Sequence, residues 1–228
     1  MKEEPDKEEK KEEEPPKKPP LPPLEKAAKR LERLLSEKAL DFYTSPSKIV
    51  RRWLTNASAV SGGATAEDIR SASQRLLDPS QCPGRALLSS SESMEEDGAG
   101  TNYLTTASAR EIESWLISLA VRILWKEKKY EEALQLAQKG IDIILGIIDA
   151  SASSPGSASS LFPLLSRLYR WRSLIVESAK NPALDAQLMA DMAKAHNLAT
   201  LRRDVDTQAT LLNCMLRNLL HYSQGKIH

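Results

Sequence analysis

Apolar residues along most of the chain recur at spacings of three and four, the period of a helix with one buried face. The first such stretch predicts a helix over residues 24–43, and Ser45, followed by a proline, predicts the start of a second. A Thr-Ala-Glu-Asp sequence beginning at Thr65 has the form of a helix cap. It predicts a short third helix that ends near Leu77.

The same period returns in the second half of the chain, where it predicts two long helices joined by a short polar turn. A Ser-Ala-Arg-Glu sequence from Ser108 to Glu111 has the form of a capping box, and a helix should follow it to about Lys128. A second helix starts at Tyr130, and the small Ala133 lets two antiparallel helices approach closely. This pair resembles a tetratricopeptide-type (TPR) hairpin.

Three more helices are predicted beyond this pair, over residues 161–179, from Pro182 to about Leu198, and over 206–222. The low glycine and aromatic content agrees with helices rather than with many short strands. We therefore expect an all-α fold in which helical hairpins stack as a TPR-like α-solenoid, with residues 108–228 as its repeat region.

Two segments lack this period and separate the predicted regions. Residues 1–23 contain only Met, Lys, Glu, Asp, Pro and Leu, a composition that cannot build a core, so they predict a disordered tail before the helical segment 24–77. Residues 78–107 are rich in Ser, Gly, Pro and acidic residues and predict a flexible loop. Ser93 in this loop fits an acid-directed kinase, although a plain loop is the favoured interpretation.

The last predicted helix, residues 206–222, is apolar over more than half of its circumference. Full burial of a large apolar side chain contributes about 1.5–3 kcal/mol, so exposing several leucines would forfeit an amount comparable with a domain's net stability. We expect this helix to be covered, either by earlier helices or by another chain. The candidate interface residues are Leu211, Leu212, Met215, Leu216, Leu219, Leu220 and Tyr222.

The formal net charge of +1 gives no global field that would attract nucleic acid, membrane or an acidic substrate. The chain starts without the apolar core of a signal peptide, and its apolar runs are shorter than the roughly 20 residues that cross a bilayer. These features predict a soluble, intracellular protein that binds neither nucleic acid nor membrane.

Motifs for catalysis or metal binding are missing from the sequence, which has no Gly-rich phosphate loop, CxxC pair or HExxH. Its histidines share no metal-ligand spacing, and Cys82 and Cys214 are expected to be reduced thiols. Cys214 and His221 would lie about 10 Å apart along one helix, too far for a nucleophile and its base. We expect no enzyme activity, no cofactor, no metal and no small-molecule substrate.

One run near the end of the chain carries a family resemblance. Thr200 to Arg202, Gln208 to Asn213, Leu216 to Asn218 and Leu220 to Tyr222 follow the pattern of the third non-ATPase subunit of the proteasome regulatory lid. The resemblance implies a non-catalytic scaffold in cytoplasm and nucleus that helps ubiquitin-tagged proteins reach the proteolytic core. It also implies binding to other lid subunits, including a small acidic disordered one.

Members of this family continue through further repeats to a winged-helix (PCI) module, so the resemblance implies that this chain is an N-terminal portion. Its final helix is then expected to be the first half of a helical pair. Two alternatives stay open: a scaffold of a related PCI complex, such as the signalosome or a translation initiation factor, or a non-functional truncated gene product.

Overall fold

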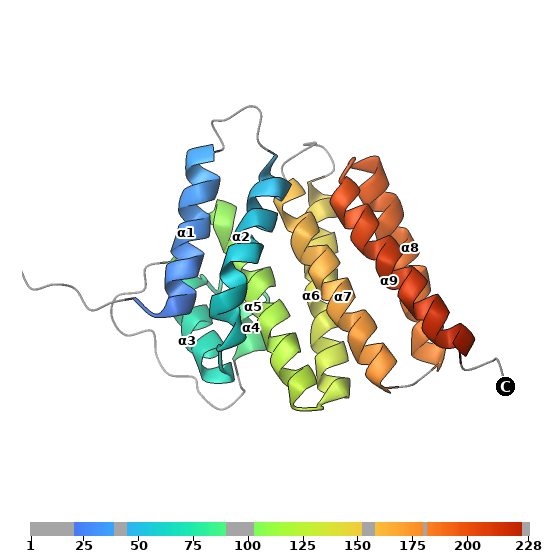
Figure 1. Cartoon of the computed structure of the whole chain (residues 1–228). Coiled ribbons are helices and arrows are strands. Elements are labelled where there is room, and N and C mark those ends of the chain that lie inside the picture. Colours follow the sequence, from blue (N-terminus) through green and yellow to red (C-terminus); the bar gives the residue numbers. More distant parts are fainter. Residues whose placement is uncertain (1–20, 39–44, 90–102, 152–157, 180–181, 225–228) are drawn as a thin grey trace, which may run out of the picture.

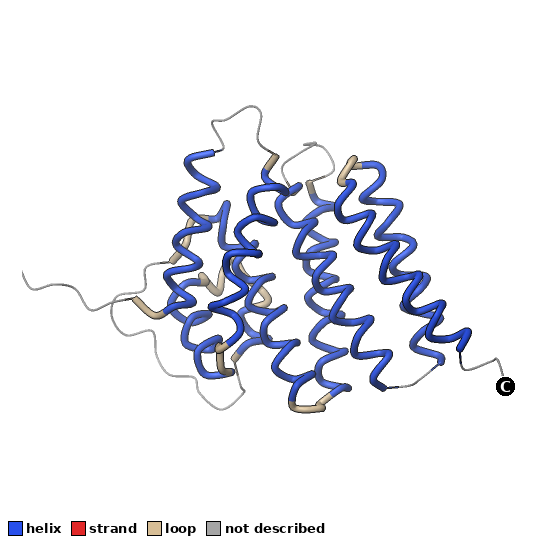
Figure 2. The backbone as a smooth tube through the Cα atoms, viewed as in Figure 1, coloured by secondary structure: helices blue, strands red, loops and turns tan. Residues whose placement is uncertain are grey.

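The structure, a computed structural model, describes residues 21–38, 45–89, 103–151, 158–179 and 182–224. Every regular element in these ranges is helical, as Figure 2 shows, so the all-α prediction is confirmed. The elements are α1 (Pro23–Lys38), α2 (Pro46–Gly62), α3 (Ala66–Leu76), α4 (Arg85–Leu88), α5 (Thr106–Lys126), α6 (Tyr130–Ala150), the 3-10 turn η1 (Ser159–Leu161), α7 (Phe162–Ala179), α8 (Pro182–Leu201) and α9 (Val205–Gln224).

The helices from α5 onward stack in sequence order as a solenoid (Figure 1). Helix α5 packs on α6, α6 packs on α7, and α7 packs on both α8 and α9, which also pack on each other. In Figure 1, α6 lies behind α7 and α8 lies behind α9. Alternate helices α5, α7 and α9 are therefore neighbours along one side of the stack.

Small residues on α6 allow its neighbours in the stack to approach closely. Ala133 and Ala137 are fully buried, which agrees with the role predicted for Ala133. A Cβ atom built on Gly140 would lie 2.8 Å from Ile117 Cγ2 on α5 and 3.2 Å from Leu168 Cδ1 on α7. At Gly140, helix α6 thus contacts both neighbours through its backbone.

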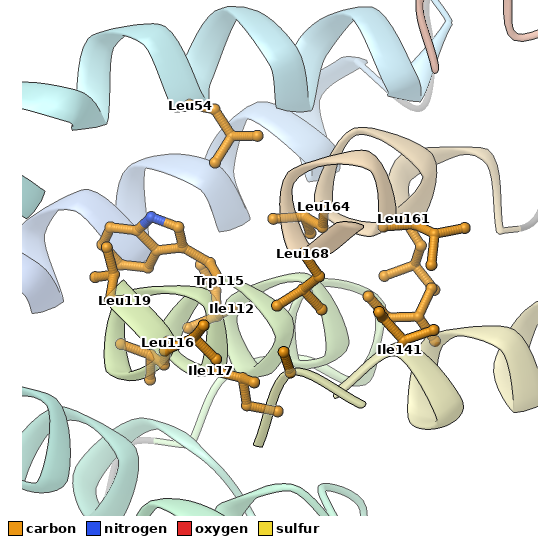
Figure 3. Packing of buried hydrophobic residues seen from close by; sticks show 14 of the residues in the cluster. Leu54, Ile112, Trp115, Leu116, Ile117, Leu119, Ile141, Leu161, Leu164 and Leu168 are labelled. Atoms are coloured by element: carbon orange, nitrogen blue, oxygen red, sulfur yellow. The ribbon is translucent and has the colours of Figure 1, made fainter. Parts of the chain in front are cut away.

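The N-terminal helices share one core with the repeat helices. The Trp53 ring of α2 meets the Trp115 ring of α5 edge to face, with centroids 4.9 Å apart, and Trp53 Nε1 donates a hydrogen bond to the Ala27 carbonyl at 3.0 Å. Figure 3 shows side chains such as Leu54, Trp115, Ile141 and Leu168 meeting in this core. The predicted segments 24–77 and 108–228 are therefore packed together.

The prediction of a flexible loop over 78–107 is wrong for the two ends of this segment, which the structure describes. Helix α4 lies within it, and Cys82 and Leu104 are buried. Glu113, fully buried on α5, accepts a hydrogen bond from the Gly84 N–H, and burial raises the pKa of its carboxyl to about 7. The amino-acid composition did not reveal these contacts, because glycine and proline also occur in tight, well-packed turns such as this one. Residues 90–102, which include Ser93, lie outside the described residues.

Of the two predicted capping boxes, the one at Thr65 is confirmed and the one at Ser108 is wrong. Thr65 Oγ1 accepts from the Asp68 N–H at 3.2 Å, and Asp68 Oδ2 accepts from the Thr65 N–H at 2.9 Å. Helix α5 instead begins at Thr106, before Ser108. Glu111 lies buried and accepts a hydrogen bond from Ser160 Oγ at 2.5 Å, so it joins α5 to η1 rather than capping its own helix.

Other predicted boundaries shift by a few residues. Helix α1 is described to Lys38, so the predicted extension to residue 43 lies outside the described residues, as do residues 1–20 of the predicted tail. Helix α5 ends at Lys126 and α9 starts at Val205, one residue before its predicted start. Among the described residues, no helix combines the length and the apolar character that crossing a membrane requires.

The close approach at Gly140 predicts opposite effects for the same substitution at two sites on α6. Gly140→Ala should destabilise the fold by about 1–3 kcal/mol, because the added methyl group must displace Ile117 and Leu168. Gly146→Ala is the matched control: nothing lies within 4 Å of its Cβ position. It should stabilise the fold by about 0.5–1 kcal/mol through helix propensity. Denaturant unfolding of both variants measures the difference, and equal shifts would contradict the close packing.

Candidate protein interface

The turn between α8 and α9 fixes where α9 begins. Arg203 adopts a left-handed backbone conformation with φ of 55°, which ends α8 and redirects the chain. Asp204 then caps α9, since its Oδ1 accepts a hydrogen bond from the Thr207 N–H at 3.0 Å. Its Oδ2 accepts a second one from Ser47 Oγ on α2 at 2.7 Å. A residue of α2 thus holds the cap of α9.

Arg51 strengthens this connection between α2 and α9. Its guanidinium lies 3.7 Å from Asp204 Oδ1 and 2.5 Å from Asp206 Oδ2. Burial lowers the pKa of Arg51, and the charge of Asp204 opposes that effect. Because Arg51 and Asp206 are partly exposed, this ion pair contributes modestly, and the partly buried Ser47–Asp204 hydrogen bond is the more constraining contact.

One side of α9 packs against the chain's own helices. Its buried residues are spaced by three or four: Thr207, Leu211, Cys214 and Asn218. Asn218 Oδ1 accepts a hydrogen bond from Ser173 Oγ on α7 at 2.7 Å, and Arg217 makes two hydrogen bonds to Glu177, at 2.9 and 3.2 Å. These contacts fix the rotation of α9 about its own axis.

That rotation turns a set of large apolar side chains to solvent. Val205, Leu212, Leu216 and Leu220, which we term the α9 stripe, are 70%, 45%, 56% and 65% exposed. Their spacing of seven, four and four places them on one face, opposite the buried residues. Leu219 and Leu201, which are 50% and 81% exposed, widen this surface. An apolar face of this kind on a rigidly held helix is typical of a protein interface.

The predicted interface residues divide between the two sides of α9. Leu212, Leu216, Leu219 and Leu220 are exposed, whereas Leu211 is fully buried and Met215 is partly buried against the core. The buried face explains why Leu211 is not available to a partner. Tyr222 lies among the residues whose side chains are not described. Sequence reasoning missed Val205 and Leu201, although two apolar residues beside the polar turn 202–204 were a usable signal.

The two cysteine thiols are engaged in packing. Cys82 and Cys214 are both buried free thiols, and burial raises the pKa of each. The Nε2 atom of His221 lies 3.6 Å from Glu177 Oε1. In the described part of the chain, no group of three or more His, Cys, Asp or Glu residues is arranged to hold a metal ion.

Comparison with known families identifies this arrangement. The model for "PSMD3-like, N-terminal TPR repeats" matches residues 24–226, which is nearly the entire described chain. This chain belongs to that family. The match covers the N-terminal helices as well as the repeat helices, in agreement with their common core.

Relatives within the family are regulatory subunits of the proteasome. The chain is 33% identical over 132 residues to the probable 26S proteasome non-ATPase regulatory subunit 3 of Daucus carota, a match that covers 57% of this chain and 24% of that protein. It is 28% identical over 113 residues to 26S proteasome non-ATPase regulatory subunit 3 of Dictyostelium discoideum, covering 50% of this chain and 20% of that protein. The matched region therefore spans about a quarter or less of these relatives.

The exposed α9 stripe predicts that the isolated chain self-associates. Light scattering should give an apparent mass that rises with concentration above the monomer mass of 25.3 kDa. The double variant Leu216→Glu/Leu220→Glu should restore the monomer, with a stability change within about 0.5 kcal/mol because both side chains are exposed.

A matched control places the same charge change elsewhere. Gln135→Glu/Lys139→Gln on exposed positions of α6 also lowers the net charge by two, and it should leave the self-association unchanged. A wild-type chain that stays monomeric at high concentration would contradict the prediction.

Proposed function

We propose that this chain is part of a non-catalytic scaffold subunit of the 26S proteasome regulatory lid, and that it supports ubiquitin-dependent protein degradation through contacts with other subunits. The α9 stripe is the observation that carries this proposal. A helix whose cap, rotation and packed side are all fixed, yet whose opposite side exposes Val205, Leu212, Leu216 and Leu220, is suited to receive another helix.

Family membership supports the choice of complex. The relatives named above are proteasome subunits, and their names describe a non-ATPase regulatory role, which favours the proteasome over a related PCI complex. The same names favour a protein without catalysis of its own. We infer a location in cytoplasm and nucleus, where proteasomes work.

The proposed partners are other lid subunits. A helical partner would place its own apolar side on the α9 stripe, and the half-buried Met215 at the edge can adapt to its shape. A small acidic disordered lid subunit is a further proposed partner of the repeat region. Nucleic acid, membrane and small-molecule substrates are not part of the proposal.

The proposal is tested by expressing the tagged 228-residue chain in cells and sedimenting the lysate on a gradient. We expect the tagged chain to overlap with proteasomal peptidase activity, at a gel mass equal to the chain's 25.3 kDa plus the mass of the tag. The variant Leu216→Glu/Leu220→Glu should lower that overlap at least fivefold, because charged side chains in a buried interface are costly.

The control variant Gln135→Glu/Lys139→Gln should co-sediment like the wild type. A wild-type chain confined to the light fractions would overturn the assignment to the complex. Co-sedimentation that the α9 variant leaves unchanged would instead overturn the role of the stripe.

A further inference from the structure

Arginine side chains gather on the α5–α7 side of the solenoid without acidic partners. Arg167 and Arg170 are three residues apart on α7 and so are surface neighbours, and Arg122 on α5 is near enough for its charge to act on Arg167. Burial lowers the pKa of Arg167, and the positive charges of Arg122 and Arg170 lower it further. No carboxylate of the described chain offsets these effects.

Arg167 is the least satisfied member of this cluster. It is partly buried, and its Nε atom is buried without a hydrogen-bond partner. Arg122 uses one donor on the Ser61 carbonyl at 3.0 Å, which leaves most of its guanidinium available. Glu177, an acid farther along α7, is engaged by Arg217 and His221. Partly burying several guanidinium groups without a counter-charge costs free energy, and a bound anion would offset that cost.

Two tryptophans close in sequence to these arginines pack against each other and join α5 to α7. Trp125, three residues after Arg122, packs its ring on that of Trp171, with centroids 5.6 Å apart and planes inclined by 49°. Trp125 Nε1 also donates a hydrogen bond to Ser178 Oγ at 3.3 Å. Both rings are partly exposed. Helices α5 and α7 are thereby held together, and the rings offer an apolar edge beside the charges.

We propose that Arg122, Arg167 and Arg170 form a binding site for a phosphorylated serine or threonine in a segment of a partner protein, with Trp125 and Trp171 contacting a flanking apolar side chain. A phosphate group carries a charge of about −2 and three acceptor oxygens, so it matches several guanidinium forks. A single carboxylate would leave most of the positive charge unbalanced.

The alternatives fit the site less well. A nucleic acid presents a long row of phosphates and needs a wider basic surface than one cluster, while the whole chain has a net charge of only +1. The tryptophan rings pack on each other instead of presenting open faces for base stacking. The site is also distinct from the α9 stripe and does not depend on proteasome membership.

The experiment screens the 228-residue chain against a library of peptides with phosphoserine between randomised flanks, and repeats the screen with serine and with glutamate at that position. The best phosphopeptide, labelled with fluorescein, is then titrated by anisotropy. We expect at least tenfold tighter binding of the phosphopeptide than of either counterpart.

Variants test the assignment to the arginines. Arg167→Met should weaken phosphopeptide binding at least tenfold while the thermal midpoint stays the same or rises, because a partly buried charge whose Nε atom has no hydrogen-bond partner is removed. Arg170→Ala, at an exposed position, should weaken binding without affecting the fold. Lys139→Ala, which removes one positive charge from an exposed position on α6, should leave binding unchanged.

Several outcomes would overturn the proposal. These are a library without enrichment of phosphorylated members, equal affinity for the glutamate peptide, and unchanged binding by Arg167→Met and Arg170→Ala. Displacement of the phosphopeptide by polyuridine at equal phosphate concentration would point to nucleic acid and would also overturn it.

Discussion

The close packing of α7 within the stack is the constraint on which the rest of the structure depends. Helix α7 contacts α2, α5, α6, α8, α9 and η1, and most of its large apolar side chains are removed from water. Because α7 has neighbours on so many sides, it sets the positions of the helices at both ends of the solenoid relative to each other. Gly140 on α6 makes this possible because any side chain there would meet Leu168 of α7.

Helix α9 takes its orientation from α7 and from α2. Ser173 and Glu177 hold Asn218 and Arg217, while Ser47 and Arg51 hold the start of the helix through Asp204. Polar contacts at both ends thus determine which side of α9 turns inward. Since Thr207 and Asn218 occupy buried positions, leucines that could have filled the core remain on the outer side. The exposed apolar surface of α9 therefore follows from the polar residues at its buried positions.

Much of this fold can be predicted from the sequence, because helical periodicity and capping chemistry are local. The helices, the Thr65 cap and the small Ala133 follow from short stretches of residues. The role of Glu111 could not be predicted, since its partner Ser160 comes from a distant segment. The side of α9 that is buried is set by Ser47 and Ser173, so periodicity alone could not separate Leu211 from Leu212. The arginine cluster likewise arises only when α5 and α7 meet.

We propose that α9 is fixed by its inner side and receives a protein partner on its outer side. Thiol labelling at Leu216→Cys tests this most directly, with Lys139→Cys on α6 as the reference position. We expect rapid labelling of both thiols in the monomeric chain at low concentration, and strong protection of Leu216→Cys alone in fractions that contain the proteasome. Equal labelling of Leu216→Cys in those fractions and in the free chain would contradict it.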